Sequence, residues 1–256
     1  MKVAPRRMAD SPAAMPRTNS IAALRSIAQP REYSPSQTDR PYRAVSIYLS
    51  VPLARAGATP NGITIAWIVV GLVGVVGLLA DAWAVRVVAG LLLELSYLLD
   101  FVDGEVARLT NRRSNVGGFL DLLGHGVLKA SLPLAVGAAA AAHTGHLVFA
   151  AAGGLGAVVI VVGDALRFYA ACTINDLSAG DLGHDAVPVR PRSPSRVTVG
   201  RLLFTTFDLS FESPGLYGLA LLAAVTDRLD VLAVYWAVGG SCWFLRRALT
   251  YCRRLS

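Results

Sequence analysis

The chain has 256 residues, of which 54% are hydrophobic and 16% charged, and its formal net charge is +7. Soluble domains average about 45–50% apolar and about 25% charged residues, so this composition favours a membrane protein. The positive charge does not by itself identify a partner, and no interleaving of aromatic and basic residues accompanies it, so we expect no nucleic-acid partner. The three cysteines are widely spaced and form no CxxC pair, which argues against a disulfide framework and a zinc site.

Residues 1–42 are rich in Pro, Ser, Arg and Ala and show no lasting periodicity, which is typical of a disordered basic tail. We leave open whether residues 20–28 form a short helix. No apolar core of the length of a signal peptide precedes residue 44, so a secretory signal is not expected. The remaining residues, 43–256, are expected to form one membrane domain.

This domain is expected to be all-α, with an interfacial amphipathic helix followed by six transmembrane helices. Residues 43–55 mix aromatic and aliphatic side chains with flanking arginines, as in a helix that lies along the bilayer. The Thr-Pro-Asn at 59–61 then breaks the chain, because a residue before proline is biased away from helix. Six apolar runs follow; a membrane-crossing helix needs about 20 residues, and all the runs except the fifth have at least about that length. They cover residues 62–80, 83–103, 119–142, 146–172, 214–226 and 229–252.

The basic residues predict the orientation of these helices. Twenty-one of the twenty-four Lys and Arg residues lie in residues 1–61, 104–118, 167–213 and from residue 246 onward. Cytoplasmic segments carry such an excess, so both termini are expected in the cytoplasm. A transporter with an inverted repeat should show a matching acidic or broken helix in its second half. The acids here gather once, where the second expected span meets the third, and this disfavours a transporter.

The acids of this junction have helical spacing. Asp100 and Asp103 are three residues apart, and Asp121 and His125 are four apart, so each pair lies on one face of its helix. A short loop joins the two helices as antiparallel neighbours, so the two polar faces can meet. Converging carboxylates repel one another unless cations bridge them, and Mg²⁺ or Mn²⁺ prefers oxygen ligands and often brings substrate phosphates.

Small and basic residues near the acids favour a phosphate ligand. Gly104, Ala107 and Gly117 would let a phosphate approach the backbone closely, and Arg108 can bind it through two nitrogens. The residues therefore indicate a metal-dependent phosphoryl-transfer site at the inner surface of the membrane.

The complete pattern resembles a known signature. It reads Asp100-x-x-Asp103-Gly104-x-x-Ala107-Arg108, eight residues, then Gly117-x-x-x-Asp121-x-x-x-His125. This is similar to the signature of the CDP-alcohol phosphotransferases, which ends in a fourth aspartate where this chain has His125. The resemblance implies a six-helix membrane fold, usually a homodimer, with a cytoplasm-facing cavity for two divalent ions and a CDP-alcohol donor. An acceptor hydroxyl attacks the donor phosphate, and CMP leaves.

The resemblance also implies roles for individual residues. The metal ligands would be Asp100, Asp103 and Asp121, together with the family's fourth position, His125. The CDP moiety would be bound by Asn61, Gly104, Ala107, Arg108, Ser114 and Gly117.

Three interpretations of His125 compete. It is the general base, since imidazole is the commonest such base near neutral pH. Alternatively it is a metal ligand, and the second metal is then held more weakly. In the third interpretation the protein is a non-catalytic, nucleotide-binding membrane protein. The presence of the three aspartates and Arg108 favours an active enzyme.

The acceptor site is less defined by the sequence, and its candidates are Lys129, Arg167 and Arg196. A lysine inside a span is costly, so Lys129 either holds an acceptor phosphate or carboxylate or pairs with an aspartate. Arg167 and Asp164 form either an ion pair or the rim of this site. Arg196 belongs to an arginine-rich loop that either reflects topology and lipid headgroups or cradles an acceptor phosphate. An inositol or glycerol phosphate, another polyol or sugar phosphate, and a lipid alcohol are all compatible acceptors.

Overall fold

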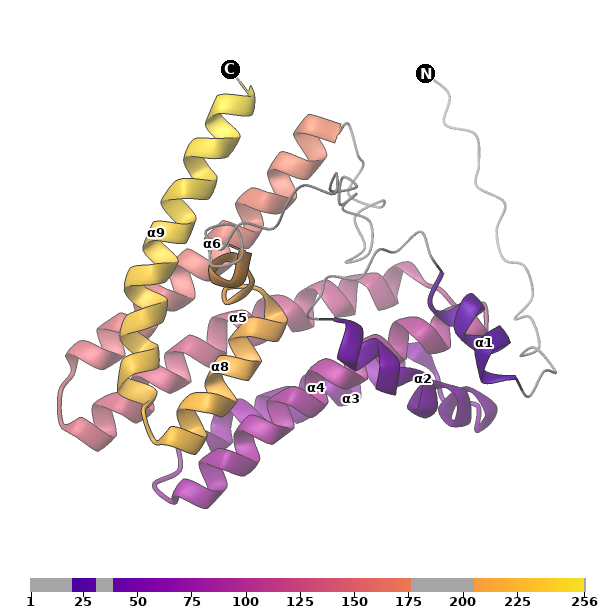
Figure 1. Cartoon of the computed structure of the whole chain (residues 1–256), viewed down its shortest axis with the longest axis horizontal. Helices are drawn as coiled ribbons and strands as arrows, with labels where there is room; N and C mark the ends of the chain where they lie inside the picture. Colours follow the sequence, from indigo (N-terminus) through magenta and orange to yellow (C-terminus); the bar gives the residue numbers. More distant parts are fainter. Residues whose placement is uncertain (1–19, 31–38, 176–204, 256) are drawn as a thin grey trace.

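The computed structural model describes residues 20–30, 39–175 and 205–255, and these residues are largely helical (Figure 1). Their helices are α1 (Ile21–Ala28), α2 (Arg40–Arg55), α3 (Pro60–Gly77), α4 (Trp83–Leu109), α5 (Asn115–Thr144), α6 (Val148–Asn175), α8 (Ser213–Thr226) and α9 (Leu229–Leu255). No strand occurs in this part of the chain. The predicted all-α fold class is confirmed.

Three of the helices in the described residues are long and apolar enough to cross a membrane: α3, α5 and residues Val148–Ala170 of α6. The other segments predicted as spans are also helical. The apolar run of helix α4 is interrupted by Arg86 and Glu94, and α8 is an apolar helix of only 14 residues. The apolar helices support a membrane protein, while the six-span arrangement stays a prediction.

The two N-terminal helices pack together beside α4 (Figure 1). Helix α2 covers the segment predicted as interfacial, and it exposes Tyr48 while it buries Ile47 and Ser50. Helix α1 lies within the predicted tail, in residues 20–28, for which the sequence did not decide whether a short helix forms. Its Leu24 and Ala28 are fully buried in an apolar cluster with residues of α2 and α4. The rest of the predicted tail, apart from residues 20, 29–30 and 39–42, lies outside the described residues.

Helices α3, α4 and α5 pack closely and position the acidic junction. Helix α3 begins after Thr59, whose side chain accepts a hydrogen bond from the Gly62 N–H at 3.2 Å. At Gly71 a Cβ atom would lie 2.6 Å from Leu128 of α5 and 2.8 Å from the Ser96 hydroxyl of α4. Only glycine permits this approach, so α3 brings the other two helices together. The C-terminal end of α4 and the N-terminal end of α5 then meet across a short loop.

Helices α5 and α6 contact each other backbone to backbone at Gly153. A Cβ atom there would lie 2.5 Å from the Pro133 carbonyl oxygen and 2.8 Å from the Gly137 Cα, whereas a Cβ at Gly154 would meet nothing within 4 Å. We expect Gly153→Ala to lower the free energy of unfolding by about 1–3 kcal/mol, because backbone atoms cannot move aside. The adjacent Gly154→Ala is the matched control and should be neutral or slightly stabilising. Thermal unfolding in detergent measures both, and equal midpoints would contradict the close helix contact.

Candidate active site

The acidic junction forms a compact polar cluster made by α4 and α5. One ligand atom each of Asp100, Asp121 and His125 lies within 4.8 Å of the others. The Nε2 atom of His125 lies 3.3 Å from Asp100 Oδ1 and 3.5 Å from Asp121 Oδ1. The imidazole is 95% buried and its ring centroid lies 5.0 Å from that of Trp67, so its orientation is fixed between α3 and the two carboxylates. The helical spacing of these residues correctly predicted that the two polar faces meet.

Asp103 lies on the same helix as Asp100, but one of its oxygens is turned toward α3. Its Oδ2 atom accepts hydrogen bonds from the Thr64 hydroxyl at 2.7 Å and from the Trp67 indole N–H at 2.9 Å. The side chain is almost fully buried. Asp103 is therefore held rigidly by two donors, and it does not belong to the compact group of Asp100, Asp121 and His125.

Three of the residues predicted to bind CDP gather at the start of α5. Ser114 is the N-cap of this helix and accepts a hydrogen bond from the Gly117 N–H at 3.0 Å. The Ser114 hydroxyl donates to Asn61 Oδ1 at 3.4 Å. A Cβ atom at Gly117 would lie 2.7 Å from the same Asn61 oxygen, so glycine lets this side chain come close to the first turn of α5. The N-terminal end of α5, with its partial positive charge, precedes Asp121 on the same helix by about two turns.

The remaining predicted CDP-binding residues lie on the last turns of α4. The guanidinium of Arg108 lies over Gly104, since a Cβ at residue 104 would be 3.3 Å from one of its Nη atoms. Arg108 Nε donates to the Ala28 carbonyl of α1 at 2.5 Å. The Ala107 carbonyl accepts from the Arg112 N–H at 3.0 Å and closes the turn that leads to α5. The predicted CDP-binding residues therefore fall into two groups, one at the start of α5 with Asn61 of α3 and one on the last turns of α4.

Residues 58–189, just over half of the chain, match the family model described as CDP-alcohol phosphatidyltransferase. The chain belongs to the CDP-alcohol phosphatidyltransferase family. No curated protein has a significant sequence match to the chain. The matched residues include α3, α4 and α5 and with them the whole acidic cluster. The family is one of membrane proteins that transfer a phosphate group from a CDP-alcohol, and its members generally use divalent metals.

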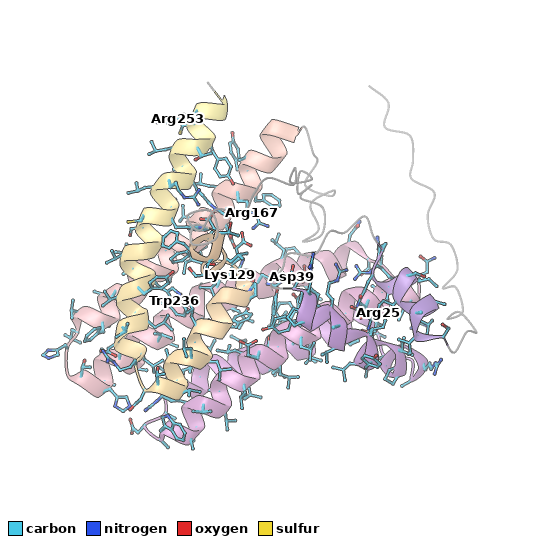
Figure 2. All side chains as sticks on the ribbon, in the orientation of Figure 1. Arg25, Asp39, Lys129, Arg167, Trp236 and Arg253 are labelled. Atoms are coloured by element: carbon cyan, nitrogen blue, oxygen red, sulfur yellow. The ribbon has the colours of Figure 1, made fainter. Side chains whose placement is uncertain are left out.

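Lys129 of α5 is buried in this family member and forms an ion pair with Asp164 of α6. Of the two alternatives given for Lys129, binding an acceptor or pairing with an aspartate, the structure shows the pairing. Arg167 pairs instead with Glu212 at 3.4 Å, and Arg247 of α9 reaches the same Glu212 oxygen at 3.2 Å. Figure 2 shows Lys129 and Arg167 near each other in the middle of the molecule.

These ion pairs join α5, α6 and α9 to the N-terminal end of α8. Arg247 also stacks over the Trp243 ring at 4.3 Å from its centroid. Its Nη1 atom is buried, with no hydrogen-bond partner in the part of the chain that the structure describes. The third predicted acceptor residue, Arg196, lies outside the described residues.

Two glutamates of α4 are polar groups that the sequence pattern did not single out. Glu94, in an otherwise apolar run, accepts a hydrogen bond from the Tyr42 hydroxyl of α2. Burial, together with this bond, raises the pKa of the Tyr42 phenol well above its ordinary value, so the phenol stays a donor. Glu105, inside the signature itself, is completely buried. Both glutamates could have been noticed in the sequence, because each is an acidic residue within a long, largely apolar helix.

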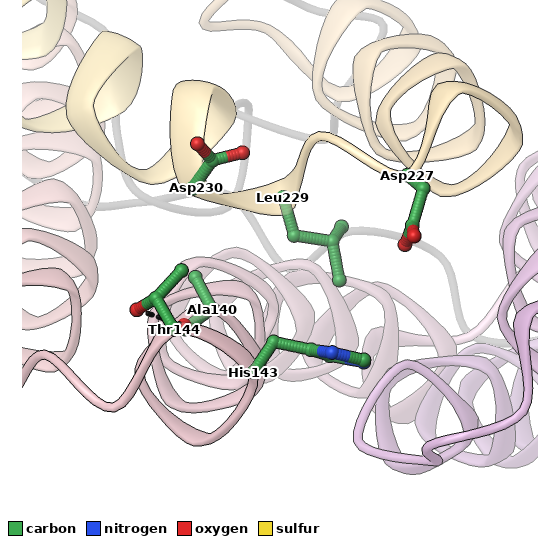
Figure 3. A pocket seen from close by; sticks show the side chains of 6 residues that line it. All are labelled: Ala140, His143, Thr144, Asp227, Leu229 and Asp230. Carbon is green, nitrogen blue, oxygen red and sulfur yellow. Dashed lines mark hydrogen bonds between the residues drawn. The ribbon is translucent and has the colours of Figure 1, made fainter.

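A small pocket of about 80 Å³ lies far along α5 from the acids, beside the turn between α8 and α9 (Figure 3). It is lined by Ala140, His143, Thr144, Asp227, Leu229 and Asp230. Next to it, the buried Arg86 donates to Asp227 Oδ1 at 2.5 Å and contacts His143 Nε2. His143 is exposed and belongs to the last turn of α5. These contacts tie together the helix ends opposite the acidic cluster.

Proposed function

We propose that this protein is a metal-dependent CDP-alcohol phosphotransferase that moves a substituted phosphate from a CDP-alcohol to an acceptor hydroxyl and releases CMP. Such a reaction serves phospholipid or phospho-polyol biosynthesis. The observation that carries the proposal is the cluster of Asp100, Asp121 and His125, held where α4 and α5 meet. Half-buried acids near a helix N-terminus and an arginine are what a metal-bound diphosphate requires.

The donor set of the cluster fits a divalent ion. The carboxylates of Asp100 and Asp121, whose ligand atoms lie within 4.8 Å of each other, suit Mg²⁺ or Mn²⁺, and His125 in the same group is then left to act as the base. Asp103 would complete the set through the oxygen that does not bind Thr64 and Trp67. Bound divalent ions, two by resemblance to the family, would polarise the donor diphosphate and stabilise the leaving CMP.

The protein's own residues would bind and orient the donor. Arg108, held over Gly104, would contact the diphosphate. The capped N-terminus of α5, with Ser114, Gly117 and Asn61, would receive the rest of the CDP moiety, along the surface that also includes Ala107. His125, left out of the ligand set, would take the proton of the acceptor hydroxyl as a neutral imidazole, and the carboxylates of Asp100 and Asp121 beside its Nε2 atom would stabilise the imidazolium that forms.

The acceptor would bind beyond His125, toward Lys129 and Arg167, with Arg196 as a further candidate. Lys129 lies one helical turn from His125 along α5, and Arg167 shares Glu212 with Arg247. Basic side chains held in place by acids form a prepared site for an anionic acceptor, in which the acceptor takes over part of the pairing. This arrangement favours a phosphorylated acceptor over an uncharged lipid alcohol.

The proposal includes an arrangement in the membrane. Six helices (α3, α4, α5, α6, α8 and α9) would cross the bilayer, α2 would lie along it, and both termini and the acidic cluster would face the cytoplasm. The distribution of basic residues supports this orientation. The homodimer expected of the family is part of the same proposal.

The role of His125 is tested by CMP release from a CDP-alcohol and acceptor pair chosen from a donor-by-acceptor panel. We expect His125→Ala to reduce CMP release about a hundredfold, which is a typical loss for a general base, because no group then accepts the proton. His125→Asp, which creates the aspartate of the family signature, should retain most of the activity. An unchanged rate in His125→Ala would exclude the base role. CDP binding by the wild type without CMP release on any pair would favour the non-catalytic nucleotide-binding alternative.

A further inference from the structure

The end of α1 contacts the signature arginine directly. Arg108 Nε donates to the carbonyl of Ala28, the last residue of α1, at 2.5 Å. Ala28 is fully buried. The last carbonyls of a helix carry a partial negative charge and lack helical partners, so a cation that binds them is stabilised. The N-terminal helix, which lies outside the residues that match the family model, thus contacts a residue of the signature.

The same contact sets the direction of the guanidinium. Both Nη atoms lie 3.3–3.4 Å from the place where a Cβ atom of residue 104 would be. The guanidinium is therefore confined between the Ala28 carbonyl on one side and Gly104 on the other. A diphosphate bound at Gly104 would meet an arginine that is already oriented, which lowers the entropic cost of binding.

The end of α1 is itself fixed by Glu105. The carboxylate accepts from the Gln29 amide at 2.7 Å, and from the hydroxyls of Ser46 at 2.5 Å and Ser50 at 2.7 Å. The Gln29 amide also donates to the Arg43 carbonyl at 2.7 Å. Gln29 directly follows Ala28, so its hydrogen bonds determine where the Ala28 carbonyl points. Apolar packing of α1 would hold the helix on the domain without aiming this carbonyl.

We propose that Gln29 and Glu105 are positioning residues for the nucleotide site: they lock the end of α1 so that the Ala28 carbonyl holds Arg108 over Gly104. This inference rests on the proposed function, in which Arg108 contacts the diphosphate of the donor. It assigns to α1 a part in substrate binding and gives the fully buried Glu105 side chain a role.

The test measures the affinity of the purified full chain for CDP in the presence of Mg²⁺, by calorimetry in detergent. We expect Gln29→Ala to weaken CDP binding about tenfold, the loss that corresponds to one hydrogen bond to a charged group. Gln29 is only half-buried, so its removal leaves the fold intact. Ser26→Ala is the matched control on the same helix, because the exposed Ser26 hydroxyl donates to Ala23 within α1, and its CDP affinity should equal that of the wild type.

A double-mutant cycle separates positioning from general stabilisation. If Gln29 acts through Arg108, then Gln29→Ala has no further effect on CDP affinity in the Arg108→Ala background. Glu105→Gln, which keeps the shape of the side chain, should behave in the same way. Additive losses, or wild-type affinity in Gln29→Ala, would overturn the inference and leave the proposed function intact. Failure of the wild type to bind CDP would overturn the proposed function and this inference with it.

Discussion

Asp121→Ala is expected to lower metal-dependent CMP release at least about a thousandfold. Asp121 supplies one of the two carboxylates of the compact cluster, and its Oδ1 lies 3.5 Å from His125 Nε2. Its removal takes away both a metal ligand and a negative charge, and electrostatic stabilisation of the leaving group is usually the largest part of such a rate enhancement. The initial rate of CMP release at saturating Mg²⁺, with Mn²⁺ in a parallel series, measures the effect.

Two variants sharpen this experiment. Asp121→Asn keeps the shape of the side chain and should lose nearly as much activity, because the charge is what the ion requires. Asp81→Asn removes an exposed acid in the loop before α4, away from the cluster, and should leave the rate unchanged. EDTA should abolish wild-type activity, and added Mg²⁺ should restore it. Wild-type rates in Asp121→Ala would show that the cluster is not the metal site.

Much of this site was predictable because local rules determine it. The three-residue and four-residue spacings put Asp100, Asp121 and His125 on facing helix surfaces, and the short loop made those helices neighbours. The ends of α3 and α5 follow from residues that cap helices: Thr59 and Ser114 each accept a hydrogen bond from the N–H three positions on. These features depend on a few adjacent residues, so the sequence is sufficient.

The features that the sequence did not predict depend on contacts between distant helices. The hydrogen bonds of Asp103 to Thr64 and Trp67 require the exact rotation of α3 against α4. The partner of Lys129 is 35 residues away, on a helix whose facing side no periodicity identifies. The docking of α1 was missed because eight helical residues flanked by a polar tail give a weak signal, and their stability comes from packing.

The second large effect is expected at the ion pair between Lys129 and Asp164. Lys129→Met should lower the free energy of unfolding by about 3 kcal/mol, because it leaves the Asp164 carboxylate, only a quarter exposed, without its lysine. Arg228→Met is the matched control: the Arg228–Asp230 pair is solvent-exposed at Arg228, and such pairs contribute under about 1 kcal/mol. Unfolding in mild detergent measures both variants, and equal small losses would contradict a buried, structurally important pair.

A double replacement then separates stability from acceptor binding. Lys129→Met combined with Asp164→Leu removes both charges and keeps apolar volume, so most of the lost stability should return. If Lys129 serves only to hold α5 against α6, the KM for the acceptor returns to the wild-type value together with the stability. If Lys129 also binds an anionic acceptor, the double variant is stable but its acceptor KM stays raised at least about tenfold, while the KM for the CDP-alcohol is unchanged. The acceptor role of Lys129 requires this split, because a purely structural lysine would affect both substrates alike.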